Sequence, residues 1–308
     1  MPGQAAAYRA GTPVSAAGFL ADVARLADRL PPGGHILNVC TDRYRFTVGL
    51  AASLLTRKVS LLPPTHTPEV IRRLAAFAPD VFCLTDGERC DVDLPRVRYP
   101  VEEPRPSRHG RAARSAQAAR SAEWHVPEID ASQTAAIVFT SGSTGLPVPH
   151  RKTWGHLVRG VRDGAERLGL MDGRSHALLA TVPPQHMYGF ESSVLVALQS
   201  ANALCAQHPF YPADVCSALE RLPRVALLPQ LGHGAPLRRH LGPLEERRRR
   251  RLLVRRPHVA EDEAGDLVGG VRPNAHAVLE ARLGRLGWHV DALAGHVELP
   301  AVVHAAEA

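Results

Sequence analysis

The run T-S-G-S-T-G at residues 140–145 combines hydroxyl side chains and glycines in a pattern that suits a phosphate group. Gly142 and Gly145 can adopt backbone conformations that are closed to other residues, so the chain can pass close to a ligand. Successive amide groups in such a turn can converge on an anion. The hydroxyl donors beside them are Thr140, Ser141, Ser143 and Thr144. The run therefore predicts a phosphate-binding loop, with an ordinary surface turn as the alternative.

The residues on either side of this run predict the elements that position it. The apolar stretch at 134–140 indicates a buried strand, and ligands of open α/β sheets bind at the carboxyl ends of strands. Thr153 can cap a helix that continues to Leu168 and carries one apolar stripe. Prolines at 147 and 149 exclude a helix between these elements. We therefore expect residues 141–149 to form an exposed loop.

Two better-known phosphate motifs do not fit the run. A Walker A loop requires G-x-x-x-x-G-K-[ST] leading directly into a helix, and the two prolines prevent that helix. The run is also not the Rossmann pattern G-x-G-x-x-G.

Strand and helix signals alternate through much of the remaining chain. Short apolar runs predict buried strands at 33–40, 59–64, 81–86, 176–182 and 202–206. Helices are expected between them, starting at Asp42, at Thr67-Pro68, at 191 and at Asp214. This alternation predicts an α/β fold with mostly parallel sheets flanked by helices.

Composition places the chain among soluble globular proteins, with 45% hydrophobic and 22% charged residues. No stretch approaches the roughly 18 apolar residues of a membrane span. The N-terminus lacks a basic region followed by an apolar run, which predicts an unprocessed, cytoplasmic protein without a membrane partner. The five cysteines show neither C-x-x-C nor Cys/His ligand spacing, so we expect structural thiols and no metal site.

The pattern T-S-G-S-T-G-x-P after an apolar strand resembles the phosphate loop of the adenylate-forming superfamily, which includes acyl- and aryl-CoA synthetases. The segment P-P-Q-H-M-Y-G-F at 183–190 is similar to the family's P-x-x-H-x-x-G motif, and residues 38–64 are similar to its first β-α-β unit. The resemblance covers about residues 30–222. Within the superfamily, the loop and the early L-L-P-P most resemble AMP-ligases of aryl-polyene and xanthomonadin pigment clusters.

The resemblance implies a two-step reaction. A small carboxylic acid attacks the α-phosphate of ATP, and a thiol of CoA or of an acyl carrier protein then takes the acyl group. The loop would hold the ATP phosphates, and Mg²⁺ would neutralise the leaving pyrophosphate. The loop residues in that role are Thr140, Ser141, Gly142, Ser143, Thr144 and Gly145.

A second group of residues carries over to the acyl pocket and the adenylate, namely His186, Tyr188 and Gly189. A histidine between a strand and a helix can equally be a structural group, and Tyr188 and the neighbouring Phe190 can equally be core residues. Most family members carry a lysine directly after the loop proline, where this chain has Val148. Lys152 or Arg151 is then the candidate cation for phosphate, and plain solvent exposure is the alternative for Lys152.

The composition changes after about residue 222. Residues 223–308 contain no Ser, Thr, Ile, Lys, Phe, Tyr, Met or Cys. The family's Y-G-x-T-E and T-G-D segments and its catalytic lysine therefore have no counterpart there, and no catalytic residue can be assigned. Such a composition is typical of a GC-rich gene read out of frame, with a genuine low-complexity basic tail as the alternative.

The sequence therefore predicts an incomplete N-terminal domain of the adenylate-forming fold at 1–222, with a linker at 100–125, and a disordered Ala/Arg-rich tail at 223–308. The function indicated is an ATP-dependent acid ligase that does not adenylate as this chain alone. The alternative is a non-catalytic remnant that at most binds nucleotide phosphate. An RNA- or DNA-binding role for the tail is disfavoured, because no aromatic residues interleave with its arginines.

Overall fold

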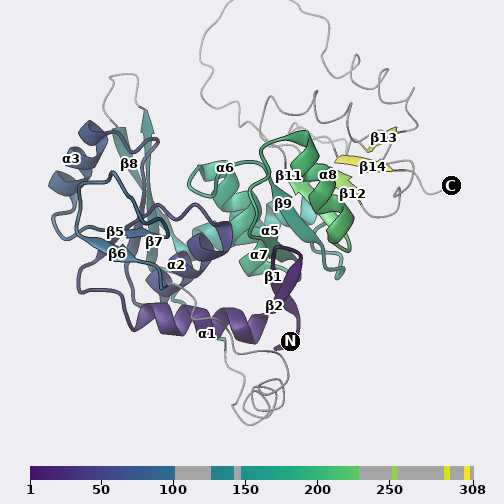
Figure 1. Ribbon diagram of the computed structural model, residues 1–308, viewed down its shortest axis with the longest axis horizontal. Helices are drawn as coiled ribbons and strands as arrows, with labels where there is room; N and C mark the ends of the chain where they lie inside the picture. Colours follow the sequence, from purple (N-terminus) through teal and green to yellow (C-terminus); the bar gives the residue numbers. More distant parts are fainter. Residues whose placement is uncertain (101–125, 142–146, 229–251, 255–287, 292–301, 306–308) are drawn as a thin grey trace, which may run out of the picture.

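The computed structural model describes residues 1–100, 126–141, 147–228, 252–254, 288–291 and 302–305. Two sheets lie side by side, with helices between them and on their outer faces (Figure 1). This arrangement confirms the expected α/β fold with mostly parallel sheets flanked by helices. The predicted linker beyond residue 100, and much of the predicted tail, lie outside the described residues.

The six-stranded sheet contains, in spatial order, β6 (Arg96–Arg98), β5 (Phe82–Thr85), β3 (His35–Asn38), β4 (Val59–Leu62), β7 (Thr134–Ser141) and β8 (Pro147–Thr153). All neighbouring strands are parallel except β7 and β8, which are antiparallel. Short apolar strands of a parallel sheet need cover on both faces. Helix α3 (Pro68–Phe77) covers one face and α2 (Arg43–Leu55) covers the other.

Both covering helices begin where the sequence predicts. The Asp42 carboxylate accepts the amide N–H of Arg45 at 2.9 Å, which caps α2. Thr67 caps α3, and Pro68 occupies its first turn. These caps satisfy amide groups that a helix N-terminus leaves without intrahelical partners.

The eight-stranded sheet contains, in spatial order, β13 (Trp288–Asp291), β14 (Val302–Ala305), β12 (Leu252–Val254), β11 (Val225–Leu228), β9 (Ala177–Ala180), β10 (Ala203–Cys205), β1 (Ala5–Arg9) and β2 (Thr12–Ser15). The strands from β12 to β1 are parallel. Helix α8 (Pro212–Arg221) packs on the outer face of this sheet. It begins two residues before Asp214, because Tyr211 is its N-cap residue and the Asp214 carboxylate accepts the Tyr211 amide N–H at 3.0 Å.

Strand β11 lies beyond the domain boundary that the sequence predicts at residue 222. It pairs in parallel with β9 from Val225 to Leu228, and all four of its residues are buried. The partition into a domain and a tail remains a prediction, but the packed sheet continues at least to residue 228.

The N-terminal hairpin β1–β2 leads into α1 (Ala16–Ala27), which Ser15 caps. The other helices in the described residues are α5 (Trp154–Arg167), α6 (Met187–Gly189), the π-helix η1 (Phe190–Leu195) and α7 (Val196–Gln199). Helix α5 confirms the prediction from Thr153 to Leu168, since these residues are its N-cap and C-cap. The helix expected from 191 is instead η1 followed by α7. None of the described helices combines the length and apolarity needed to cross a bilayer.

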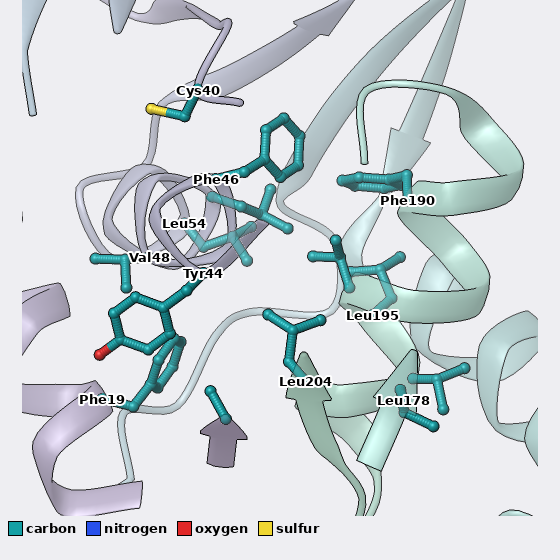
Figure 2. Packing of buried hydrophobic residues seen from close by; sticks show 14 of the residues in the cluster. Phe19, Cys40, Tyr44, Phe46, Val48, Leu54, Leu178, Phe190, Leu195 and Leu204 are labelled. Atoms are coloured by element: carbon teal, nitrogen blue, oxygen red, sulfur yellow. The ribbon is translucent and has the colours of Figure 1, made fainter. Parts of the chain in front are cut away.

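One hydrophobic cluster joins the two sheets. Figure 2 shows side chains from α1 and α2 facing side chains from β9, β10 and η1. Phe19 and Tyr44 meet edge to face with ring centroids 6.0 Å apart, and Phe46 and Phe190 are each at most 1% exposed. Because α2 contributes to the cluster and also covers the six-stranded sheet, the position of one sheet relative to the other is fixed through this helix.

Candidate functional site

The predicted phosphate loop stands in the sequence between two strands that pair with each other. Strand β7 confirms the expected strand at 134–140 and extends it to Ser141. The last pairs of the β7–β8 ladder are Thr140 with Val148 and Ser141 with Pro147. The loop residues Gly142, Ser143, Thr144 and Gly145 themselves lie outside the described residues. The chain therefore enters the predicted loop from the carboxyl end of β7 and leaves it at the start of β8.

The expectation of a loop through residue 149 is wrong, because β8 begins at Pro147. Among the strands that the structure describes, β8 is the edge of its sheet and pairs only with β7. Proline lacks an N–H and is tolerated where an edge strand directs that position away from its partner. Pro147 and Pro149 are two residues apart, which places them on the same side of the strand. The prolines therefore exclude a helix, as predicted, but not a strand.

His186 lies in a turn that follows β9. We call residues 183–189 the His186 turn. The His186 amide N–H donates to the Pro183 carbonyl at 3.3 Å, and the Phe190 amide N–H donates to the His186 carbonyl at 2.8 Å. The side-chain amide of Gln185 donates to the Cys40 carbonyl, after β3, at 2.7 Å. The turn is therefore internally bonded and also tied to the six-stranded sheet, and His186 itself is exposed.

Gly189 closes the His186 turn. It is buried, and a β-carbon at this position would collide with the carbonyl group of Pro183 and press on a Val182 methyl. Only glycine permits this approach between the two ends of the turn. The family motif that predicts Gly189 thus has a steric basis in this fold.

His66 also belongs to this region, although the sequence does not single it out. It follows β4, the parallel neighbour of β7, so it lies at the same sheet edge as the start of the predicted loop. Partial desolvation lowers the pKa of the surface-lying His66, and the nearby charge of His186 lowers it further. His66 is therefore close enough to His186 for their charges to interact, at the sheet edge where β7 ends. Its immediate context, Thr-His-Thr after two prolines, carries no recognisable signal.

The two aromatic residues of the motif differ in burial, because Phe190 lies in the core and Tyr188 is partly exposed. Phe190 is wholly buried in the cluster that joins the sheets, so its interpretation as a core residue is correct. Tyr188 is half-buried and packs against the same cluster. Burial raises the pKa of Tyr188 to about 12, so the phenol stays protonated at neutral pH and can act as a hydrogen-bond donor.

The two candidate phosphate cations lie near the end of β8, whereas the predicted loop precedes the start of that strand. Arg151 donates to the Thr134 hydroxyl at 2.7 Å, at the opposite end of β7 from Ser141. Lys152 pairs with Ala136, so the ladder separates it from Ser141 by roughly 17 Å, at about 3.4 Å per residue. The charge of Lys152 also lowers the pKa of Glu191 in η1. A phosphate contact for Lys152 remains a prediction that the position of β8 does not favour.

The carboxyl ends of β4, β7 and β9 therefore bring together the approach to the predicted loop, two histidines and a glycine-closed turn. Imidazoles and backbone amides suit an anionic ligand. Within the described ranges, no group of three or more His, Cys, Asp or Glu residues could hold a metal ion.

Comparison with known proteins gives local sequence matches and a broader likeness of fold. No family model matches the chain. A 4-coumarate–CoA ligase from Halorhodospira halophila is 37% identical over 82 residues, which are 26% of this chain and 20% of the ligase. A probable CoA ligase, CCL5, from Humulus lupulus is 28% identical over 101 residues, 33% of this chain and 18% of that protein. The matches thus span about a fifth of these curated relatives.

Solved CoA synthetases share the fold. The o-succinylbenzoate CoA synthetase MenE from Bacillus subtilis, in complex with an acyl-adenylate intermediate, superposes with a TM-score of 0.59 at 17% identity. The match covers 93% of this chain and 69% of MenE. ATP-bound MatB from Rhodopseudomonas palustris gives a TM-score of 0.60 at 16% identity, over 83% of this chain and 57% of MatB. The chain therefore has the mixed α/β architecture of part of the adenylate-forming domain in CoA synthetases.

Proposed function

We propose that this chain contains the nucleotide-phosphate site of an ATP-dependent acid–thiol ligase. The ligase activates a carboxylic acid as its adenylate and passes the acyl group to the thiol of CoA or of a carrier protein. The observation that carries the proposal is the position of T-S-G-S-T-G, which begins in the last two residues of β7 and continues from the carboxyl end of that strand. The same fold occurs in MenE and MatB, whose solved complexes contain an acyl-adenylate or ATP.

The donor set of the predicted loop fits the phosphates of ATP. Hydroxyls and glycine-rich backbone amides neutralise an anion without a fixed cation, which is consistent with the bond of Arg151 to Thr134 at the opposite end of β7. Mg²⁺ usually keeps several waters and binds substrate phosphates. It needs no cage of protein carboxylates here, and when bound it would neutralise charge on those phosphates. Within this site, His66 and His186 lie where an acid or its adenylate would approach.

The acid is proposed only by class. Resemblance to the aryl-polyene subgroup favours an aryl or polyunsaturated acid. The named relatives include ligases of coumarate and succinylbenzoate, and both of these acids are aryl compounds.

A specific observation also supports a second candidate, a remnant that binds nucleotide phosphate without catalysis. Residues 223–308 contain no Tyr, Thr or Lys. The adenine-binding segment, the ribose-binding segment and the catalytic lysine of the superfamily therefore have no counterpart there. In this case the protein would hold ATP mainly by its triphosphate.

Two measurements on the full chain separate these functions. The first is carboxylate-dependent exchange of labelled pyrophosphate into ATP over a panel of aryl, polyunsaturated and short-chain acids. The second is calorimetric binding of MgATP, AMP and inorganic triphosphate. Both use Thr144→Ala in the loop and, as a matched control, Thr12→Ala on the exposed edge strand β2.

A working ligase shows exchange that Thr144→Ala abolishes and Thr12→Ala retains. A remnant binds MgATP and triphosphate but not AMP, and it shows no exchange with any acid. Absence of triphosphate binding in a folded chain would overturn both functions, because each depends on the predicted loop.

A further inference from the structure

Arg43, the first residue of α2, is completely buried. Its guanidinium group crosses from the helix to the eight-stranded sheet. One terminal nitrogen donates to the Ser193 hydroxyl of η1 at 2.7 Å. The other donates to two carbonyls. One is that of Ala180, the last residue of β9, at 3.0 Å, and the other is that of Val182, two residues later, at 2.6 Å. These partners lie 137 to 150 residues away along the chain.

These contacts hold both ends of the His186 turn. Val182 directly precedes the turn, so its carbonyl fixes where the turn begins. The Ser193 hydroxyl, which accepts from Arg43, itself donates to the carbonyl of Gly189, the last residue of the turn. A single side chain thus connects the first and last points of the segment that carries His186 and Tyr188.

The partners of Arg43 are all uncharged, and its Nε has no hydrogen-bond partner. Burial lowers the pKa of Arg43 to about 10, so the group remains cationic at neutral pH. A buried charge costs free energy unless hydrogen bonds compensate it. A leucine or methionine at the same position would fill the space without that cost, so packing alone does not account for an arginine.

We propose that Arg43 is a positioning residue that fixes the His186 turn in the geometry of the acyl site by bonding to Val182 and, through Ser193, to Gly189. The relevance to catalysis rests on the proposed ligase function, whereas the clamp on the turn does not. The two parts are therefore tested by different measurements.

The chain offers a matched control two residues along the same helix. Arg45 also has a buried Nε without a partner. It contacts Asp86 at 3.9 Å and stacks over the Tyr99 ring at 5.5 Å. Neither of these contacts involves residues 180–193. Arg43→Met and Arg45→Met therefore remove the same charge from neighbouring positions, but only the first releases the His186 turn.

The test is hydrogen exchange by mass spectrometry on the full chain and its variants. In Arg43→Met, amides in a peptide spanning 182–193 should exchange roughly tenfold faster, the order expected for loss of a hydrogen bond to a charged group. Peptides over α3 should be unchanged. In Arg45→Met, faster exchange should appear around residues 86 and 99 instead. Arg43→Lys keeps a cationic donor and should restore part of the protection in 182–193.

Unchanged exchange in 182–193, or equal acceleration in both methionine variants, would overturn the clamp. So would an acceleration spread evenly over all peptides. If Arg43→Met does not fold by circular dichroism, Ser193→Ala removes one end of the connection, and a smaller acceleration confined to the same peptide is expected. If the chain exchanges pyrophosphate, Arg43→Lys should raise KM for the acid more than KM for ATP. If hydrogen exchange accelerates only in 182–193 and the chain shows no pyrophosphate exchange, the result supports the clamp and counts against the ligase.

Discussion

The carbonyl of Pro183 lies against the α-carbon of Gly189 so closely that the two ends of the His186 turn leave no room for a β-carbon. Gly189→Ala should therefore destabilise the protein by about 1–3 kcal/mol, because the backbone must shift to accommodate the methyl group. Urea unfolding would measure the loss. The matched control is Gly160→Ala in α5, where no atom beyond the adjoining backbone of the helix lies within 4 Å of the added carbon. Replacing this exposed helical glycine should stabilise by about 0.5–1 kcal/mol. Equal effects at both positions would contradict the close approach.

Leu227 tests whether the packed sheet extends beyond residue 222. It belongs to β11 and is wholly buried in the hydrophobic cluster that this strand forms with α8. Leu227→Ala should lower the free energy of unfolding by about 2–5 kcal/mol, as expected for a core leucine. Leu55→Ala, at the end of α2 where the residue is 39% exposed, should change it by less than about 1 kcal/mol. If the two variants unfold at the same urea concentration, β11 does not contribute to the core.

Glu191 should make stability depend on pH. Burial raises its pKa, while Lys152 and His156 partly oppose that rise. A raised folded-state pKa means that the protonated carboxyl favours folding, and this contribution is lost as pH rises through that pKa. Glu191→Gln should therefore be more stable than the parent protein at neutral pH. Its advantage should vanish below the ordinary glutamate pKa of about 4.3.

Thermal unfolding from pH 4 to pH 8 would measure this dependence for Glu191→Gln. Glu166→Gln, on the exposed side of α5, makes the same change of charge without a burial cost to relieve. A parallel gain in both variants would show that net charge, and not burial of Glu191, governs the effect.

Cys83 in β5 and Cys90 in the following loop have their sulfur atoms 3.8 Å apart. Oxidised glutathione should first form a mixed disulfide at the half-buried Cys90 and release one glutathione thiol. The Cys83 thiolate then attacks the Cys90 sulfur and displaces the second glutathione. Burial raises the pKa of Cys83 to about 12, so the second step should accelerate about tenfold per pH unit below that value.

Peptide mass spectrometry would follow both products of this oxidation. Cys216, which is also half-buried, should stop at the mixed disulfide and serves as the internal control. A Cys90 mixed disulfide that persists at high pH would contradict the proximity of the two thiols.

Local signals explain most of what the sequence predicted correctly. Asp42, Thr67 and Thr153 each precede a helix and provide a side-chain cap, a contact that needs no distant partner. Strand β7 was predictable because its continuous apolar run is too long to be part of a turn. In contrast, β8 was missed because its prolines are acceptable only at a sheet edge, and the sequence does not reveal which strand lies there.

The candidate site was predictable only where a motif covers it. Gly189 and His186 belong to a recognisable segment, whereas His66 and Arg43 are single residues among 16 histidines and 37 basic residues. Their roles depend on partners from distant parts of the chain, which pattern and propensity do not encode. Strand β11 was missed for a related reason, since four apolar residues become a strand only when β9 is available to pair with them.

The parallel pairing of β1 with β10 has a consequence for how the protein is made. Ala7 aligns with Leu204, and the Gln4 side chain donates to the Ala201 carbonyl. At roughly 5–20 residues per second, the ribosome takes about 10–40 s to deliver that partner after the N-terminus has emerged. Throughout this interval β1 has no β10 to pair with, and its unpaired edge is open to chaperones and to neighbouring nascent chains.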